Sequence, residues 1–124
     1  MSKIVFLFIL MYTSLNAIEW LSYEEGLKLQ ETNGKTIMID IVRSECHFCN
    51  EMEAEVFDNK EMIKYLGERF IAVKINLDKD TLPLGIKIHF TPSFFFIDKE
   101  QEIVKKIPGA WNIQDFKDLT RGIK

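Results

Sequence analysis

Two cysteines carry the chemistry that this sequence indicates most directly. Cys46 and Cys49 are the only cysteines among 124 residues, and they lie in the stretch SECHFCNEM, residues 44–52. The two residues between them, His47 and Phe48, give a C-x-x-C spacing. This spacing is compatible with a redox-active disulfide, with half of a metal site or with a small structural disulfide.

The position of the pair in the chain favours a reactive thiolate on Cys46. The apolar, β-branched stretch 35–42 predicts a buried strand, and a helix is expected to begin at the cysteines. Free backbone N–H groups and the dipole at such a helix start stabilise an anion. Lowering the pKa of Cys46 from about 8.5 to about 7 requires roughly 2 kcal/mol, whereas a helix terminus supplies about 0.3–1 kcal/mol. We therefore expect a further contribution from the Cys49 thiol or from protonated His47.

Cys49 is expected to complete the reaction that Cys46 begins. It lies one helical turn further on, so it is predicted to be more buried than Cys46. A thiolate on Cys46 forms a mixed disulfide with a substrate, and Cys49 then attacks that bond and releases the substrate. The Cys46–Cys49 disulfide is thus the expected redox group, and no bound cofactor is expected beside it.

The structural alternatives have less support. A disulfide that closes so short a loop contributes only roughly 2 kcal/mol in the chain-entropy model. A structural zinc site usually needs four Cys or His ligands, and only His47 and His89 are available to join the cysteines. His47 lies inside the motif and is poorly placed to complete a tetrahedron, so no metal is expected. Asn50 follows Cys49 where a haem-attachment motif has a histidine.

Hydrophobic periodicity and capping residues predict the elements that hold this motif. Ser22 and Glu25 form a capping box at the start of one helix, and Asn112 caps another. The expected order is a helix at 22–33, a strand at 35–42, a helix from the cysteines to about Phe57, a further helical turn or two within 58–70 capped by Asp58 or Asn59, a strand at 70–78, a short helix or turn at 81–90, strands at 92–98 and 102–109, and a helix at 113–123.

This order predicts an α/β domain with a mixed central sheet of about four strands. A strand, a crossover helix and a second strand make a parallel pair with a right-handed connection. The last two strands follow one another across a polar turn and are expected to pair as an antiparallel hairpin. Because the strands are apolar on both faces, we expect helices on both sides of the sheet.

Bulk composition excludes two broad classes. Hydrophobic residues make up 47% and charged residues 28%, a globular balance rather than a disordered one. The net charge is -3 and no block of five like charges occurs, so nucleic acid is not an expected partner. The length suits a single domain, which we place at residues 18–124.

The first seventeen residues, 1–17, predict a signal peptide. Lys3 is the only charge among them, the run Ile4–Met11 is apolar, and Ala17 offers a cleavage point. The segment is shorter than the about 20 apolar residues of a membrane span. Leu15 is not the ideal small residue before a cleavage site, so an uncleaved membrane anchor is the alternative.

Three separated features resemble the thioredoxin-fold thiol:disulfide oxidoreductases. The stretch MIDIVRSECHFC places Asp40 six residues before Cys46, where thioredoxins have a buried acid. The stretch FTPSFFFID contains a Thr-Pro step before a strand, and VKKIPGAW ends a strand at Gly109. The resemblance covers roughly residues 19–124 and implies a thioredoxin fold. The sequence around the motif is similar to that of periplasmic thioredoxin-like proteins found with sulfur oxidation and to that of the C-terminal domain of the electron-transfer protein DsbD.

The resemblance implies roles for residues on each side of the cysteines. Asp40 would be desolvated, with a raised pKa, and would accept the proton of Cys49 through water; the alternative is a solvated strand-end Asp. The Thr91–Pro92 bond would be cis, and the Thr91 backbone would pair with an extended substrate segment. His47 would stabilise the Cys46 thiolate, as in oxidising family members; the alternative is an ordinary exposed histidine.

A further group of residues is expected to form an apolar rim that binds peptide. They are Phe48, Gly109, Ala110 and Trp111. Trp111 has an alternative interpretation as a cover for the core. Phe94, Phe95 and Phe96 are interpreted as core and sheet packing.

We therefore predict a periplasmic thiol:disulfide oxidoreductase, a monomer that acts on exported proteins with cysteines or disulfides. We favour a reductant, because Asp40 and the sequence around it resemble those of thioredoxins. Such a reductant needs electrons from an inner-membrane donor of the DsbD or CcdA type. His47 favours the alternative of a DsbA-like oxidant. The third interpretation is a non-catalytic peptide-binding module that keeps the fold.

Overall fold

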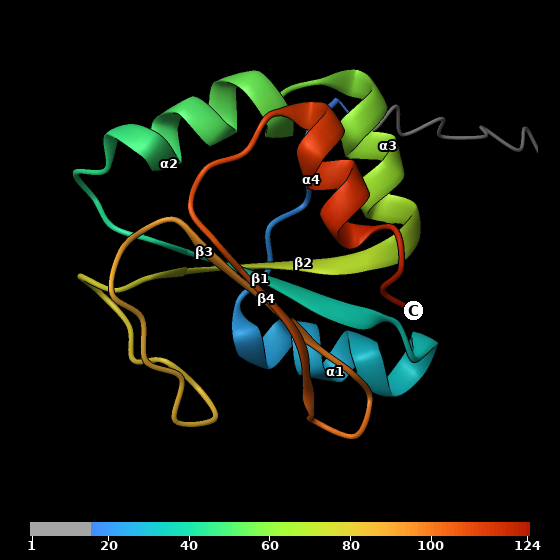
Figure 1. Ribbon diagram of the computed structural model, residues 1–124. Coiled ribbons are helices and arrows are strands. Elements are labelled where there is room, and N and C mark those ends of the chain that lie inside the picture. Colours follow the sequence, from blue (N-terminus) through green and yellow to red (C-terminus); the bar gives the residue numbers. More distant parts are fainter. Residues whose placement is uncertain (1–15) are drawn as a thin grey trace, which may run out of the picture.

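The computed structural model describes residues 16–124 and places a mixed four-stranded sheet between two layers of helices (Figure 1). The elements are α1 (Tyr23–Asn33), β1 (Thr36–Val42), α2 (His47–Met52), the π-helical segment η1 (Glu53–Phe57), α3 (Lys60–Arg69), β2 (Phe70–Asn76), β3 (Ser93–Ile97), β4 (Ile103–Pro108) and α4 (Ile113–Thr120). The predicted α/β class is confirmed. The predicted signal peptide lies outside the described residues apart from its last two, 16 and 17.

The sheet has the strand order β2-β1-β3-β4. β1 and β2 run parallel with Thr36 opposite Phe70, and β3 lies antiparallel to both β1 and β4. The predicted parallel pair and the predicted hairpin are therefore both confirmed. Because β1 and β2 are parallel, their carboxyl ends meet at one edge of the sheet, and the cysteine motif follows β1 at that edge.

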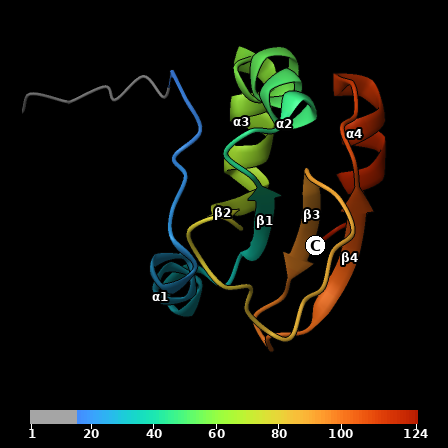
Figure 2. The ribbon, with the colours of Figure 1, turned by 90° about the vertical axis from the view of Figure 1, so that its left-hand side faces the viewer.

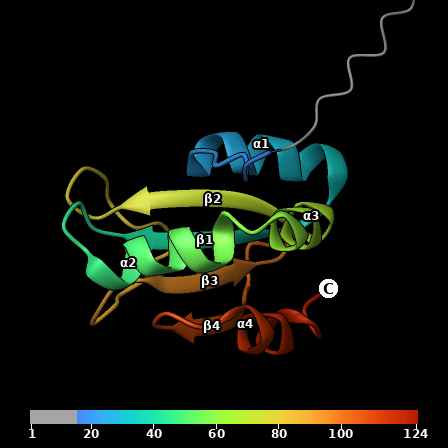
Figure 3. The same ribbon diagram turned by 90° about the horizontal axis from the view of Figure 1, so that it is seen from above.

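Helices cover both faces of the sheet, as predicted (Figures 1 and 3). α1 packs on one face, and α2, α3 and α4 pack on the other. On the three-helix side, Phe57, Phe94 and Phe116 meet edge to face, with ring centroids 5.9, 6.0 and 5.0 Å apart. Such aromatic pairs each contribute about 0.5–1.5 kcal/mol beyond their buried area. Within residues 16–124, no helix combines the length and apolar character needed to cross a bilayer.

Local hydrogen bonds explain where the helices begin. The Ser22 hydroxyl accepts from the Glu25 N–H at 3.1 Å, and the Glu25 carboxylate accepts from the Ser22 N–H at 3.0 Å. This reciprocal pair is the predicted capping box. Asn59 and Asn112 cap α3 and α4 in the same manner, each accepting a backbone N–H through its side-chain oxygen.

Two helical segments differ from the predictions. α3 runs over the whole of Lys60–Arg69, where only a further helical turn or two was expected. The helix expected to run from the cysteines to Phe57 is α-helical only to Met52, and η1 completes it with a wider turn in which the Asp58 N–H donates to the Glu53 carbonyl at 2.9 Å. The wide turn places the consecutive residues Val56 and Phe57 both in the core.

The segment expected as a short helix or turn at 81–90 forms a turn with bends, so the turn is confirmed and the short helix is absent there. Leu84 and Gly85 both have left-handed backbone angles, with φ of 56° and 65°, and two such residues in succession break a right-handed helix. Ile86 and Ile88 of this segment instead pack against the apolar cluster on the α1 side of the sheet.

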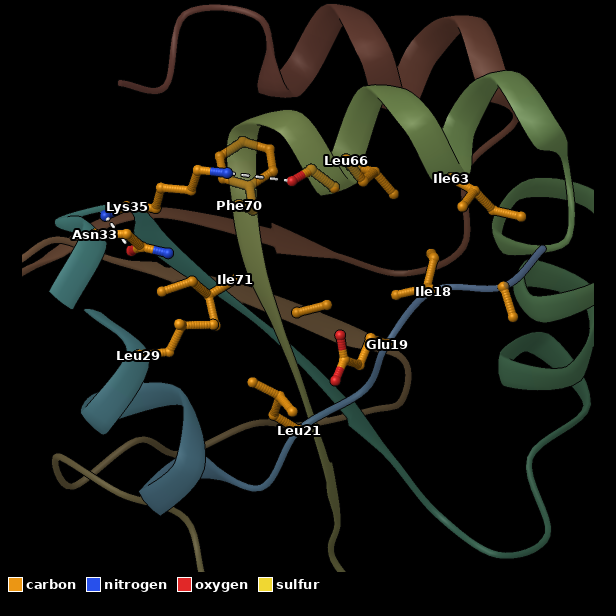
Figure 4. A pocket seen from close by; sticks show the side chains of 13 residues that line it. Ile18, Glu19, Leu21, Leu29, Asn33, Lys35, Ile63, Leu66, Phe70 and Ile71 are labelled. Carbon is orange, nitrogen blue, oxygen red and sulfur yellow. Dashed lines mark hydrogen bonds between the residues drawn. The ribbon is translucent and has the colours of Figure 1, made fainter. Parts of the chain in front are cut away.

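A hollow of about 150 Å³ lies where α1, α3 and the segment before α1 meet (Figure 4). Ile18, Leu29 and Phe70 line it, with Lys35 beside them. Lys35 directly precedes β1, whereas Cys46 follows the carboxyl end of that strand. The hollow is therefore at the end of the sheet opposite the cysteines.

Gly26 allows α1 to lie directly on β2, and Gly26→Ala is expected to destabilise the protein by about 1–3 kcal/mol through overpacking. A Cβ atom there would lie 2.6 Å from Cγ2 of Val73. Gly67→Ala on α3 is the matched control, because a Cβ at Gly67 meets nothing within 4 Å; it should stabilise by about 0.5–1 kcal/mol. Urea denaturation measures both changes, and equal stability of Gly26→Ala and the parent would contradict this packing.

Candidate redox site

The cysteine motif lies in the connection between β1 and α2, at the carboxyl edge of the sheet. Two contacts fasten this connection to the end of β2: the Ser44 N–H donates to the Asp78 carboxylate at 2.8 Å, and the Asn76 side-chain amide donates to the Ser44 hydroxyl at 3.2 Å. Cys46 and Cys49 form a disulfide, with their Cα atoms 5.2 Å apart. The structure thus joins the two sulfurs that the sequence analysis paired.

Two hydrogen-bond donors point at the sulfur of Cys46. The Cys49 backbone N–H donates to Cys46 Sγ at 3.1 Å, and the Thr91 hydroxyl donates to the same sulfur at 3.2 Å. Donors of this kind favour a charged acceptor over a neutral one. In the reduced protein they would stabilise a thiolate on Cys46, which distinguishes the two cysteines chemically.

Exposure does not distinguish them. Cys46 is 8% exposed and Cys49 is 9% exposed, so the prediction that Cys49 is the more buried residue is wrong. The disulfide holds the two sulfurs against one another, and each sulfur covers the other. The hydrogen bonds to the Cys46 sulfur, rather than exposure, therefore indicate which cysteine reacts first.

Segments far apart in the chain meet beside the disulfide. The Thr91–Pro92 peptide bond is cis, and Thr91 contacts the Cys46 sulfur through its hydroxyl. The Pro92 carbonyl accepts a hydrogen bond from the Gly109 N–H at 2.9 Å. Gly109 has a φ of 86°, a left-handed conformation that suits glycine. The structure thus brings together Thr91, Pro92, Gly109 and the cysteines, as the sequence analysis predicted.

Exposed aromatic side chains surround the site. Phe48 is 58% exposed, Phe90 is 54% exposed and Trp111 is 37% exposed. The Trp111 indole N–H donates to the Pro108 carbonyl at 2.9 Å, so its ring is held in place while one part stays open. Ala110, the neighbour of Trp111, is exposed too. Sequence reasoning did not select Phe90, although its position directly before Thr91 was a usable signal.

Asp40 is a buried acid on β1, the strand that precedes the cysteine motif. It is 2% exposed on β1 and, because side chains alternate along a strand, it shares with Met38 the face that α2 covers. Its Oδ1 atom has no hydrogen-bond partner among the described residues. Burial raises the pKa of Asp40 to about 7; Lys74 lowers that pKa and Glu53 raises it.

Lys74 and Glu53 are charged neighbours of Asp40 that sequence reasoning did not select. Lys74 lies directly opposite Asp40 in the parallel register of β1 and β2. Its ammonium group pairs with the Glu53 carboxylate at 2.6 Å and lies 4.3 Å from the centre of the Trp20 ring. The positive charge near Asp40 is therefore shared with a second carboxylate. The register of β1 against β2 brings Lys74 next to Asp40, and this register cannot be read from the sequence.

His47 is turned toward its own helix. Its Nε2 atom lies 2.9 Å from the Glu51 carboxylate, one turn on, and its side chain is 78% exposed. Its ring also meets the ring of Phe48 edge to face, with centroids 5.5 Å apart. The predicted role of His47 in stabilising the Cys46 thiolate stays a prediction. No group of three or more His, Cys, Asp or Glu suited to a metal occurs within residues 16–124.

The pH at which the Cys46 thiolate forms should depend on Thr91 far more than on His47. Thr91→Val removes a donor to the sulfur and is expected to raise the midpoint by about one pH unit, since a hydrogen bond to a charged group contributes about 1.5–3 kcal/mol. His47→Ala should leave it nearly unchanged, because the imidazole is exposed and paired with Glu51. Ultraviolet thiolate absorbance of the reduced proteins measures both midpoints, and a larger change in His47→Ala would reverse this ranking.

Comparisons with known proteins agree with this geometry. A family model described as a thioredoxin-like domain matches residues 23–123. Human spermatogenesis-associated protein 20 is 30% identical over 83 residues, which are 66% of this chain and 10% of that protein. The chain thus spans about a tenth of the length of such curated relatives.

Two solved structures show the same fold. A putative disulphide-isomerase from Bacteroides thetaiotaomicron has a TM-score of 0.71 at 24% identity, over 88% of this chain and 95% of that one. The DsbD C-terminal domain of Neisseria meningitidis, in its oxidised form, has a TM-score of 0.64 at 19% identity, over 86% of this chain and all (100%) of that one. A thioredoxin-like fold with a C-x-x-C disulfide supports thiol:disulfide oxidoreductase activity. The chain belongs to the thioredoxin-like domain family.

Proposed function

We propose that the protein is a periplasmic thiol:disulfide oxidoreductase that reduces disulfides in exported proteins. The observation that carries the proposed oxidoreductase activity is the Cys46–Cys49 disulfide with the N–H of Cys49 and the hydroxyl of Thr91 on one sulfur. That asymmetry gives one cysteine the role of nucleophile and leaves the other to resolve the mixed disulfide. The proposed direction, reduction, is supported by Asp40 and the thioredoxin-like sequence around the motif.

The reaction proceeds in two exchanges. In the reduced protein, the Cys46 thiolate attacks one sulfur of a substrate disulfide, which forms a mixed disulfide and releases the other substrate sulfur as a thiolate. Cys49 then loses its proton and attacks the Cys46 sulfur. This step forms the Cys46–Cys49 disulfide and releases the second substrate thiolate. Two electrons pass from the protein dithiol to the substrate disulfide, and no other cofactor is needed.

Asp40 accepts the Cys49 proton in this scheme. Burial brings the pKa of Asp40 to about 7, so near neutral pH the carboxyl group holds and releases a proton with similar ease. The free Oδ1 atom can accept a hydrogen bond from a water molecule that carries the proton.

The substrate segment binds beside the disulfide. The backbone of Thr91 pairs with an extended peptide in the manner of an added strand. The exposed rings of Phe48 and Trp111, with Gly109 and Ala110 between the segments, supply the apolar contact. The protein acts as a monomer on partners that expose a cysteine or a disulfide.

The proposed location is supported by the pattern of residues 1–17, which predicts a signal peptide. An exported dithiol meets an oxidising compartment, so it must be re-reduced after each turnover. We therefore assign the electron supply to an inner-membrane donor of the DsbD or CcdA type. Mass spectrometry of the mature protein tests the cleavage. If residues 1–17 are still present, the segment is an uncleaved membrane anchor and not a cleaved signal peptide.

Insulin reduction by dithiothreitol tests the proposed activity. The parent protein should accelerate precipitation of the insulin chains, and Cys46→Ser should not, because the variant lacks the nucleophile. A non-catalytic peptide-binding module of the same fold would give equal rates for both. Equal rates would therefore overturn the proposal in favour of that module.

The direction of electron flow has a second candidate, a DsbA-like oxidant. The two donors on Cys46 favour it, because they stabilise the reduced form and so raise the reduction potential. Equilibration in glutathione buffers measures that potential. A reductant should have a reduction potential of about -270 mV, like thioredoxins. A potential of about -120 mV would instead assign the protein as an oxidant.

A further inference from the structure

A second hollow, of about 170 Å³, lies beside the redox site on the α1 side of the sheet. Residues 87–90 form one wall, and β3 and β4 form the other. Figure 2 shows the yellow-to-orange segment between β2 and β3 running along these two strands toward the start of β3. Phe95 and Pro108 are among the residues that line the hollow.

The hollow is apolar within. Phe95 is 5% exposed, and Ile88 is half-buried against the same apolar cluster. Phe90 is 54% exposed at its edge, where the Ser93 hydroxyl donates to the Phe90 carbonyl at 2.8 Å and holds the bend. A cavity of about 150 Å³ lined by apolar side chains accepts a benzene ring. The hollow therefore has room for one aromatic or branched aliphatic side chain.

Three basic side chains surround this apolar floor. Lys87, His89 and Lys106 all line the hollow, and all are exposed. None of them takes part in the ion pairs found within residues 16–124. Lys106 lies opposite Phe95 in the strand register, with its ammonium group 5.8 Å from the centre of that ring. In a chain of net charge -3, this local cluster selects an anionic group next to an apolar one.

The hollow is within reach of a substrate bound at the disulfide. Phe90 is adjacent to Thr91, whose hydroxyl touches the Cys46 sulfur. The wall of the hollow then runs back along the chain from Phe90 to Lys87. An extended peptide advances about 3.3 Å per residue. A segment attached to Cys46 through its own cysteine would thus reach the hollow about three residues away.

We propose that this hollow receives an apolar side chain flanked by an acidic residue, about three positions from the cysteine of an extended protein substrate. This proposal rests on the proposed function and adds to it the class of substrate. The apolar side chain fills the space between Phe90 and Phe95, and the carboxylate pairs with Lys87 or Lys106. Because the hollow holds one side chain, a polypeptide segment is its occupant rather than a long acyl chain.

Two disulfide-linked peptide homodimers test the proposal. One carries Phe-Glu about three residues from its cysteine on both sides, and the other carries Phe-Lys at the same positions. The reduced parent protein should reduce the acidic peptide about tenfold faster, which corresponds to about 1.4 kcal/mol. Lys87→Glu/Lys106→Glu should reverse this preference. Lys60→Glu/Lys64→Glu, the same change in charge on α3 across the sheet, should keep it.

The outcomes separate the two proposals. A parent that reduces neither peptide overturns the proposed function. A parent that reduces both at equal rates keeps that function and overturns the substrate class, and decanoate binding measured by calorimetry would then assign the hollow to a free amphiphile. The substrate class is also overturned if Lys87→Glu/Lys106→Glu still prefers the acidic peptide. Should that variant fail to fold, Lys106→Gln alone is expected to lose part of the preference, and full retention contradicts the assignment.

Discussion

Asp40→Asn is expected to stabilise the oxidised protein by several kcal/mol near pH 8, but by only about 1.5 kcal/mol near pH 5. The folded protein raises the pKa of Asp40 from 3.8 to about 7 because the carboxyl group is buried. Above that pH, folding must bury a carboxylate whose Oδ1 atom has no partner. The amide of asparagine never ionises, so it avoids this cost.

The sign follows from proton binding. Between the two pKa values the folded state holds more protons than the unfolded state, so the stability of the parent falls as pH rises from about 4 to about 7. The difference of about three between the pKa values corresponds to on the order of 4 kcal/mol. Below that range Asp40 is protonated in both states, and a neutral carboxyl group resembles the amide that replaces it.

Urea denaturation at about pH 5 and about pH 8 measures this effect. Asp80→Asn is the matched control, because Asp80 is exposed and its replacement should change stability little at either pH. The contradicting result is an equal change in the free energy of unfolding between about pH 5 and about pH 8 in the parent and in Asp40→Asn. It would show that Asp40 is ionised in the folded protein well below neutral pH.

Cys49→Ser is expected to stop the reaction halfway and to accumulate a mixed disulfide with substrate. Cys46 can still attack, because its two donors, the backbone N–H of residue 49 and the Thr91 hydroxyl, do not depend on the sulfur of Cys49. Without a second thiol, the mixed disulfide has no internal route of release. Turnover should fall by about a thousandfold or more, while a covalent adduct becomes visible on a non-reducing gel.

Cys46→Ser supplies the control for that experiment. It should lose turnover as well, but it should form little adduct with the same substrate, since Cys49 lacks the hydroxyl donor that serves Cys46. Equal adduct formation by the two variants would mean that the cysteines are interchangeable.

Sequence reasoning succeeded where the signals are local. The capping box of Ser22 and Glu25 and the cap at Asn112 mark real helix starts, because each involves residues three positions apart. The strands β1 and β3 are fully or almost fully buried, and their unbroken apolar runs made them recognisable. The positions of Cys46 and Cys49 after β1 follow from the same run.

Long-range geometry accounts for what was missed. The Lys74–Glu53 pair joins β2 to the π-helical turn after α2, and the partners are 21 residues apart in the chain. Neither the register of β1 against β2 nor the extra residue in that turn has a periodic signature. For 81–90 the sequence predicted a short helix or a turn, and the left-handed angle of Leu84 that helps decide for the turn is one that leucine rarely adopts.

The most direct test of the account compares the two thiols in one molecule. The reduced protein is alkylated briefly with iodoacetamide near about pH 6, and mass spectrometry locates the label. We expect Cys46 to be labelled at least about tenfold faster than Cys49, because only its sulfur receives both the backbone and the Thr91 donors. Equal labelling, or faster labelling of Cys49, would contradict it.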